Sequence, residues 1–478
     1  MHKAPLQAAF DAATQYLEHV ADRPVARPVA ASTLRERLGG PLADAGEDPS
    51  EVIRALASHV DAGLVASAGP RYFGFVIGGS LPAALAADWL TAVWDQNAAL
   101  YLTSPAASVV ETVVAEWLLD LLGLPASASV GLVTGGQMAN FSGLAAARDE
   151  VLRRLDWDVE ERGLAAAPRI TVVVGAEAHA TIYTALRFLG IGREQVRVVE
   201  ADEQGRMRSA ALQSTLAACT GPVIVCAQAG CVNTGAFDPL GEIAQLAHAR
   251  GAWLHVDGAF GLWAAASTSK RALVAGAAEA DSWAIDGHKW LNVPYDCGIS
   301  IVRDSAAHAR ALRNARAAYL VGAAGGERDG QDWGPESSRR ARAFPIYAAL
   351  RSLGRRGVSD LVDRCCAHAA DLAGRLRTLE GATVLNEVVL NQVLVRFHAP
   401  DIDAGEFTRM VIRHVQEEGT CWLGPTSWHG TTAMRISVSN WQTTAHDMGL
   451  TFASIARAVE RAATSARPAR LPPSPGVR

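Results

Sequence analysis

Four short segments of the chain carry side chains whose combination could perform chemistry between an amine and an aldehyde. They hold, in order, Gly135 and Gly136 in a turn, His179 in a loop, Asp257 at a strand end, and Lys289. A lysine held among small and aromatic residues can be desolvated and attack a carbonyl carbon, whereas most lysines are solvated surface charges. The other three segments decide between these two interpretations of Lys289.

The Gly-Gly turn follows a strand-like run and precedes a helical run. Gly135 and Gly136 allow backbone N–H groups to approach an anion, and the positive end of the helix dipole would strengthen its binding. The turn therefore predicts an anion or phosphate contact. A plain strand-to-helix connection is the alternative interpretation.

His179 and Asp257 both follow hydrophobic, strand-like runs. His179 comes just after the run 170–174, a position where ligands bind in open α/β sheets. Its imidazole could stack on a planar ring or exchange protons, and a loop histidine bonded to the backbone is the alternative. Asp257 ends the run 253–256. A buried carboxylate there needs a partner, which could be a pyridinium N–H, an arginine or a helix N-terminus.

The four features occur in the order turn, histidine, aspartate and lysine, each at the expected carboxyl end of a strand. Pyridoxal 5′-phosphate requires the same set of groups: a phosphate cradle, a group stacked on its ring, a carboxylate at the ring nitrogen and a lysine for the aldehyde. We therefore predict that the chain binds pyridoxal 5′-phosphate.

Parallel strands that end at one edge of a sheet would position these groups. Between about 130 and 300, β-branched runs alternate with Ala-rich helical runs, and the expected strands are 130–133, 170–174, 196–199, 223–227, 253–256 and 298–302. This alternation of strand-like and helical runs predicts an α/β fold with a mainly parallel sheet flanked by helices on both faces. Residues 358–460 predict a smaller α+β unit, with strands at 382–385, 393–397 and 434–438.

The same pattern divides the chain into four expected parts. They are an N-terminal helical arm (1–80), a large cofactor-binding domain (81–345), a small C-terminal α+β domain (346–466) and a disordered tail (467–478). The tail has four prolines among its twelve residues, a composition that favours disorder.

The composition argues against several classes of partner. A net charge of −5 and a sequence pI of about 6.2 give no indication of binding to nucleic acid or an anionic membrane surface. No apolar run reaches membrane-spanning length, and no signal-peptide core is visible at the N-terminus. The seven cysteines are irregularly spaced and form no C-x-x-C pair, which predicts a reducing compartment, no metal site and a cytoplasmic protein.

From about 70 to 441 the chain resembles the pyridoxal-phosphate-dependent group II decarboxylases, which include the aromatic-L-amino-acid, glutamate and diaminobutyrate decarboxylases. The matching segments are 103–106, 134–140, 234–239, 255–257 (His-Val-Asp), 288–290 (His-Lys-Trp) and 434–440. The His-Val-Asp and His-Lys-Trp motifs at this spacing are highly specific. The resemblance implies a type I (aspartate-aminotransferase-like) fold with a seven-stranded sheet. It also implies a homodimer with its active site at the subunit interface.

The resemblance assigns roles to individual residues. Lys289 would bond to the cofactor aldehyde, Asp257 would hold the ring nitrogen, and His179 would stack on the ring face opposite Ala259. The implied phosphate contacts are Gly135, Gly136, Gln137, Ser282 and His288, while Asn233 would approach the cofactor from the side and Arg435 would hold the substrate carboxylate.

The activity that the resemblance implies is the decarboxylation of an L-amino acid. Tyr72, Phe73, Phe75 and Trp94 form a candidate lining that favours an aromatic or bulky side chain. Packing in the core or at the dimer interface is the alternative role for these aromatic residues.

One feature of the family is missing. Its mobile loop normally carries a tyrosine that protonates the substrate carbon after CO2 leaves, and relatives with phenylalanine there produce aldehydes. Alignment on Trp333 and the pair Arg339-Arg340 places Gly330 at that position. No tyrosine lies between Tyr319 and Arg339.

Three hypotheses follow from this departure. The first is a decarboxylase that uses another acid, such as His179, Tyr319 or a water molecule. The second is a pyridoxal-phosphate enzyme that diverts the reaction to oxidative deamination or to Cα–Cβ bond chemistry. The third is a non-catalytic structural homologue, against which the joint presence of Lys289, Asp257 and His179 argues.

Overall fold

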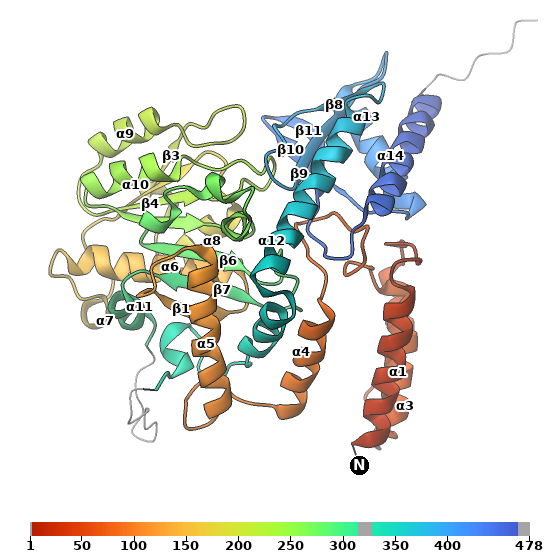
Figure 1. Cartoon of the computed structure of the whole chain (residues 1–478), viewed down its shortest axis with the longest axis horizontal. Coiled ribbons are helices and arrows are strands. Elements are labelled where there is room, and N and C mark those ends of the chain that lie inside the picture. Colours follow the sequence, from red (N-terminus) through yellow and green to blue (C-terminus); the bar gives the residue numbers. More distant parts are fainter. Residues whose placement is uncertain (1, 314–326, 467–478) are drawn as a thin grey trace, which may run out of the picture.

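The computed structural model of the chain describes residues 2–313 and 327–466, so the expected tail 467–478 lies outside the described residues. Helices and two sheets build the described part (Figure 1). The helices are α1 (Lys3–His19), α2 (Ala31–Leu38), α3 (Pro49–Val60), α4 (Pro82–Trp94), α5 (Pro105–Leu122), α6 (Gly136–Arg153), α7 (Val159–Arg162), α8 (Ala180–Phe188), α9 (Ser209–Ala218), α10 (Leu240–Ala249), α11 (Ser305–Leu312), α12 (Ala343–Leu376), α13 (Ala404–Glu418) and α14 (Ala445–Ala466).

The larger sheet has seven strands in the order β1-β7-β6-β5-β4-β2-β3. The strands are β1 (Ser129–Val133), β2 (Thr171–Gly175), β3 (Val196–Val199), β4 (Val223–Gln228), β5 (Trp253–Asp257), β6 (Ser282–Asp286) and β7 (Gly298–Val302). Only β7 runs against its neighbours, and the other pairs are parallel. The mainly parallel sheet predicted from the sequence is therefore confirmed, and β6 is a strand that the β-branched pattern did not single out.

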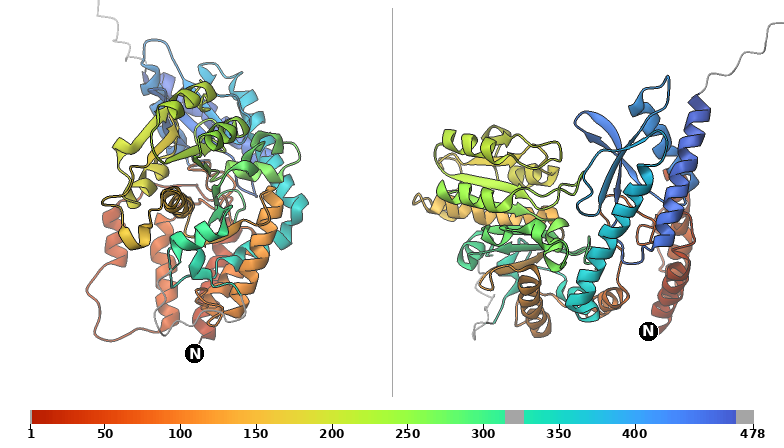
Figure 2. Two further views of the ribbon diagram at one scale, coloured as in Figure 1. Left: turned by 90° about the vertical axis from the view of Figure 1, so that its left-hand side faces the viewer. Right: turned by 45° about the horizontal axis from the view of Figure 1, so that its top comes forward.

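Both faces of this sheet are buried, and helices cover each face (Figure 2). Alternate residues of a strand point to opposite faces. On β2, Val172 and Val174 belong to a core shared with α6, α8 and α11, whereas Val173 belongs to the larger core on the other face. Strands buried on both faces need apolar residues at nearly every position, which explains the continuous apolar runs in the sequence.

The second sheet is small, antiparallel and built from the C-terminal part of the chain. Its order is β10-β11-β9-β8, with β8 (Ala382–Val384), β9 (Gln392–Phe397), β10 (Gly424–Trp428) and β11 (Thr431–Ser437). The long helix α12 runs from the large sheet to this small one (Figure 1). It breaks at Gly354, whose φ of 60° is a left-handed conformation that glycine adopts without steric cost.

The N-terminal helices α1 and α3 pack side by side and lie apart from the large sheet, beside α4 (Figures 1 and 2). None of the described helices is long and apolar enough to cross a membrane. All seven cysteines are unpaired.

Candidate active site

The candidate site lies at the edge of the large sheet where β1, β2, β4, β5 and β6 end. Val133 and Asp286 both pair with Gly298, and Gln228 pairs with Asp257, so these strand ends are neighbours. The four segments predicted to do chemistry all leave the sheet at this edge. The fold thus brings together residues that lie more than 150 positions apart in the chain.

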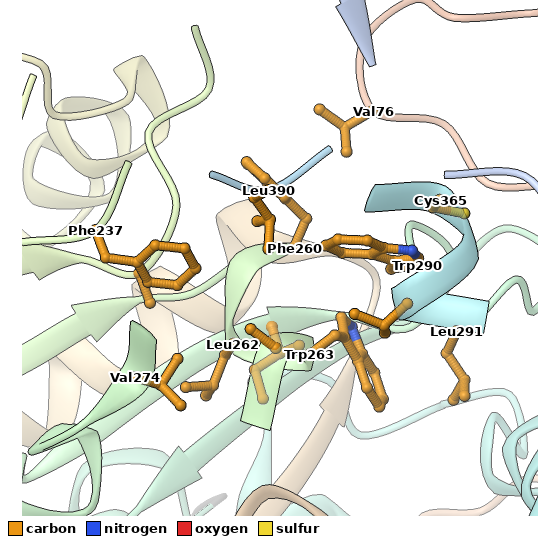
Figure 3. Packing of buried hydrophobic residues seen from close by; sticks show 14 of the residues in the cluster. Val76, Phe237, Phe260, Leu262, Trp263, Val274, Trp290, Leu291, Cys365 and Leu390 are labelled. Carbon is orange, nitrogen blue, oxygen red and sulfur yellow. The ribbon is translucent and has the colours of Figure 1, made fainter. Parts of the chain in front are cut away.

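Lys289 follows β6 by three residues, and its Nζ lies 3.0 Å from Oδ2 of Asp286. Asp286 is only 2 % exposed, and its other oxygen lies 3.4 Å from Nε2 of His288. The next residue, Trp290, is fully buried and lies between Phe260 and Cys365 (Figure 3). A buried tryptophan fixes the backbone here, so that the lysine amine is presented at the sheet edge beside a carboxylate.

The Gly-Gly turn forms a cradle at the start of α6. The first N–H groups of a helix lack intrahelical partners and can bind an anion. A Cβ at Gly136 would lie 2.6 Å from Asp286 Oδ2, and one at Gly135 would lie 3.3 Å from the His288 ring. A side chain at either position would therefore collide with Asp286 or His288, so glycine keeps the backbone N–H groups of the turn uncovered, and Gln137 in the same turn is partly exposed. The N–H groups of this turn and of the helix start have the chemistry that a phosphate requires.

His288 borders this cradle. Its Nδ1 accepts a hydrogen bond from the backbone N–H of Cys297 at 3.2 Å. Burial lowers the pKa of the imidazole; the Asp286 carboxylate opposes this effect and the Lys289 ammonium adds to it. A neutral ring whose Nδ1 is an acceptor carries its proton on Nε2, which leaves an N–H donor at the cradle.

Asp257 ends β5, and its carboxylate is held by two N–H groups. The backbone N–H of Ala259 donates to Oδ1 at 3.2 Å, and Nδ2 of Asn140 donates to Oδ2 at 3.2 Å. Asp257 is buried, and no lysine or arginine of the described residues forms an ion pair with it. A carboxylate that lacks a cation is suited to receive a pyridinium N–H.

His179 caps the N-terminus of α8, and its side chain is exposed in the single chain. Its surroundings lower its pKa because they displace water; the Asp257 carboxylate opposes this shift and the charges of Lys289 and Arg435 add to it. Three of the charged groups that act on the imidazole, Asp257, Lys289 and Arg435, are predicted site residues, and Asp286 is the fourth. The structure brings Lys289, Asp257, His179 and Arg435 into one electrostatic neighbourhood.

Arg435 and Asn233 approach from the small sheet and from the loop after β4. Arg435 lies on β11, is partly buried, and burial lowers the pKa of its guanidinium. Among residues 2–313 and 327–466, no carboxylate forms an ion pair with it. The amide oxygen of Asn233 accepts a hydrogen bond from Thr426 of β10 at 2.8 Å, which ties this loop to the small sheet.

The phosphate role assigned to Ser282 is wrong. Ser282 begins β6, whereas Asp286 ends it. Four residues of strand separate the two by about 13 Å, at roughly 3.3 Å per residue. The Ser282 hydroxyl is fully buried and bonded to Trp253 and His255. It therefore cannot reach a phosphate at the opposite edge of the sheet.

The proposed aromatic lining is only partly supported. Phe73 is a core residue with 1 % exposure, so its assignment to the substrate lining is wrong. Trp94 lies on α4 and packs edge-on against Phe344 of α12, 5.1 Å between ring centres. Tyr72 is stacked on Trp422, with ring centres 5.0 Å apart, and burial raises the pKa of its phenol to about 12.

Three residues near the site were missed by sequence reasoning. Asp286 could have been found as an aspartate that ends a strand, like Asp257, three residues before the lysine. Tyr295 places its ring 4.3 Å from the ring of His288 and is 57 % exposed. Asn140 lies within the phosphate-turn motif but points towards Asp257. No local signal marks Tyr295, because its contact with His288 depends on the loop that precedes β7.

Comparison with known proteins identifies a family and relatives of this chain. The model of the pyridoxal-dependent decarboxylase conserved domain matches residues 33–398. The aromatic-L-amino-acid decarboxylase of Bacillus atrophaeus is 27% identical over 451 residues, 92% of each chain. The acidic amino acid decarboxylase of Mus musculus is 31% identical over 376 residues, 77% of this chain and 67% of the relative.

Solved structures show the same fold. Oryza sativa TDC with PLP and tryptamine superposes with a TM-score of 0.89 at 24% identity, covering 96% of this chain and 97% of that one. Mouse CSAD in its apo form gives a TM-score of 0.88 at 25% identity, with 95% and 98% covered. The predicted type I fold is therefore confirmed. Because the family model covers most of the chain and the relatives are aligned over most of their length, the chain belongs to the pyridoxal-dependent decarboxylase family, a group of carboxy-lyases that use pyridoxal 5′-phosphate.

Proposed function

We propose that the protein decarboxylates an L-amino acid with an aromatic or bulky side chain, and that Lys289, Asp257 and His179 act on the cofactor. The observation that carries this proposal is Arg435. It is a partly buried guanidinium with no ion-pair partner among the described residues, and its charge acts on His179. A cation in this state is suited to bind the carboxylate of a substrate.

When bound, pyridoxal 5′-phosphate supplies an electron sink for the negative charge left on the substrate carbon as CO2 departs. The chain's own residues bind and orient it. Gly135, Gly136, Gln137 and His288 offer N–H donors to the phosphate, Asp257 would hold the proton on the ring nitrogen, and Lys289 supplies the amine. His179 and Ala259 would hold the ring between them, and Asn233 borders it.

Aromatic side chains support the choice of substrate. Tyr72 stacks on Trp422, and Phe75 packs on the same indole with ring centres 5.5 Å apart. Tyr295, whose ring centre lies 4.3 Å from that of His288, is a further aromatic side chain at the site. Named relatives act on aromatic, acidic and diaminobutyrate substrates, so the aromatic preference rests on these contacts.

The reaction also requires a proton at the substrate carbon. Gly330 cannot be replaced by tyrosine without rearrangement, because a side chain there would run into Arg339 and the backbone of Ala98. Tyr319 lies outside the described residues. Tyr295 is a further candidate donor: although the residue is more than half exposed, the side chains around its hydroxyl displace water and raise the pKa of the phenol to about 12, and Asp286 and Tyr72 add to this shift. A phenol with that pKa keeps its proton at neutral pH.

Oxidative deamination to an aldehyde is the second candidate function. The enclosed position of Gly330 favours it, because the usual loop tyrosine has no counterpart there. A substrate carbon that is not promptly protonated can react with oxygen, which would release an aldehyde, ammonia and peroxide.

The proposal includes a homodimer. Large apolar side chains are exposed on α1, α3 and α4, and they are Leu6, Phe10, Leu17, Val52, Leu56, Trp89, Leu90, Val93 and Trp94. Phe10 of α1 meets Trp89 of α4, with ring centres 6.3 Å apart, so the faces of these helices adjoin. A second copy of the chain would cover these residues and close the exposed side of His179.

Product analysis tests the function. The purified protein, loaded with pyridoxal 5′-phosphate, is incubated with single L-amino acids in air and under nitrogen, and CO2, amine, aldehyde and peroxide are measured. We expect amine equal to CO2 for aromatic substrates, and no product from Lys289→Ala. Oxygen-dependent aldehyde would favour the second candidate, and consumption of no amino acid would reject both.

A further inference from the structure

A continuous chain of buried side-chain hydrogen bonds runs behind the site. It begins at Trp253, passes through Ser282 and His255, and reaches Asn140 of α6 over distances of 2.9, 2.8 and 2.9 Å. At Asn140 it divides. One N–H of the amide meets Asp257 at 3.2 Å, and the other meets Thr181 at 3.3 Å.

The direction of each hydrogen bond is fixed from the two ends. The indole of Trp253 can only donate, and the carboxylate of Asp257 can only accept. Asn140 must therefore turn its NH2 group to Asp257 and its oxygen to Nε2 of His255. His255 then carries its proton on Nε2 and accepts from the Ser282 hydroxyl at Nδ1, while Ser282 accepts from Trp253. Every donor in this chain of hydrogen bonds thus faces an acceptor.

The second branch supports the tautomer of His179. The backbone N–H of Thr181 donates to Nδ1 of His179 at 3.3 Å, and the Thr181 hydroxyl lies 2.9 Å from the same atom. Because that hydroxyl accepts from Asn140, its own proton is free to be donated to Nδ1. Neutral His179 therefore carries its proton on Nε2, a tautomer that the backbone N–H of Thr181 sets and that the Asn140 amide supports through the Thr181 hydroxyl.

Because the members of this network are buried, each of their polar groups must keep its hydrogen-bond partner. Asn140, His255, Ser282 and Trp253 are all buried, and His255 has a pKa lowered to about 3 by burial, so it stays neutral. Gly143 of α6 permits the contact, since a Cβ there would lie 2.8 Å from the His255 ring. A buried donor or acceptor left unpaired is costly, so the removal of one member affects its neighbours.

We propose that Asn140 is a positioning residue which, supported by His255, Ser282 and Trp253, holds Asp257 oriented for the ring nitrogen of the cofactor. Through Thr181 it also supports the tautomer of His179. The inference rests on the proposed placement of Asp257 and His179 against the cofactor. It gives Ser282, which cannot reach the phosphate, a supporting role at the far end of the same network.

The variant Asn140→Leu tests the proposal, because leucine has nearly the same shape and no hydrogen-bonding groups. We expect pyridoxal 5′-phosphate to bind roughly tenfold more weakly, since one N–H to a charged carboxylate is lost. We also expect the pH midpoint of the cofactor's visible absorption band to move by roughly one unit. Ser142→Ala is the control: this buried serine of α6 bonds only to the backbone oxygen of Met138, and both quantities should stay as in the unmodified protein.

A second pair of variants covers the case in which Asn140→Leu does not fold. His255→Gln can still donate to the Asn140 oxygen and should behave almost like the unmodified protein, whereas His255→Leu should reproduce the shift. Unchanged affinity and midpoint in Asn140→Leu, or equal behaviour of the two His255 variants, would overturn the proposal. Neither readout requires a substrate, so a failure of the decarboxylation assay would be distinguishable from a failure of this inference.

Discussion

The Asp286 carboxylate lies 3.0 Å from the Lys289 ammonium, and the two side chains compensate each other at the edge of the sheet. Asp286 is almost wholly buried, and Oδ1 has no hydrogen-bond partner among the described residues. The lysine amine is therefore held by a single carboxylate oxygen beside the phosphate cradle. The ion pair between Asp286 and Lys289 holds the amine at the sheet edge, and the stability of the site depends on this ion pair.

Lys289→Ala should abolish cofactor attachment and destabilise the protein. Loss of one partner of a buried pair costs about 3–5 kcal/mol, and the lower value is expected because the Lys289 side chain is partly exposed. Urea unfolding and borohydride reduction followed by mass spectrometry measure the two effects. The double variant Asp286→Asn/Lys289→Ala should recover most of the stability but no attachment. A covalent cofactor adduct in either variant would contradict the role of Lys289.

Arg435→Gln should weaken substrate binding and leave the cofactor in place. Hydrogen bonds to a charged group are worth about 1.5–3 kcal/mol, so kcat/KM should fall roughly 10- to 100-fold, mainly through KM. Arg435→Lys should restore only part of the loss, because lysine lacks the planar fork. Arg409→Gln is the matched control, since Arg409 is exposed and bonds Thr432. An unchanged KM in Arg435→Gln would contradict carboxylate binding by this residue.

Tyr295→Phe should alter the partition between amine and aldehyde. If the phenol donates the proton to the substrate carbon, its loss should slow amine release roughly 10²- to 10⁴-fold and raise the share of aldehyde. Chromatography of both products from one reaction measures this ratio. Tyr347→Phe, which alters a tyrosine stacked on Trp117 of α5, should leave the ratio unchanged. An unaltered ratio in Tyr295→Phe would remove Tyr295 as the donor.

The buried histidine His255 should make the fold sensitive to acid. Its folded pKa of about 3 lies below the ordinary value of 6.5, so between these values the unfolded chain binds one proton more. Stability therefore rises with pH across this window, by about 1.4 kcal/mol per unit, and is lost as the pH falls from 6.5 towards 3. His308, buried with a pKa also lowered to about 3, adds an equal slope.

Urea unfolding of the apoprotein between pH 4.5 and 6.5, values chosen to lie inside this window, measures the slope. His255→Gln should lower the slope by the amount that corresponds to one bound proton, about 1.4 kcal/mol per pH unit. The double variant with His308→Gln should lower it by about twice that amount. A slope that does not change in either variant would mean that these histidines titrate alike in the folded and unfolded chains.

A charge on the apolar face of α1 should prevent dimer formation. Phe10→Asp places a carboxylate among exposed apolar side chains, and burial of an unpaired charge in an interface is unfavourable. Sedimentation velocity should show a shift from dimer to monomer, with activity that recovers at higher protein concentration. Val198→Asp, at an exposed apolar residue of β3, is the control. A dimer that persists in Phe10→Asp would place the interface elsewhere.

The local pattern of the chain was sufficient for much of the site. Asp257, His179 and the turn at Gly135 each lie where an apolar run stops, and the end of a strand is a local property of the sequence. Lys289 was instead marked by its His-Lys-Trp motif. In a parallel sheet such ends meet at one edge, so the residues could be grouped before their contacts were known. The strand β6 escaped notice because Ser282–Asp286 contains one β-branched residue, Ile285.

The contacts across the sheet were decided by the tertiary structure alone. Asn140 and Asp257 are 117 positions apart, and they meet because α6 packs on the strands β5 and β6. The phosphate contact predicted for Ser282 is wrong for the same reason. Ser282 and Lys289 are close in sequence but lie at opposite ends of β6, and the register of β5 against β6 brings Ser282 to His255. Sequence spacing determines where a strand stops, whereas the order and register of strands determine which side chains meet.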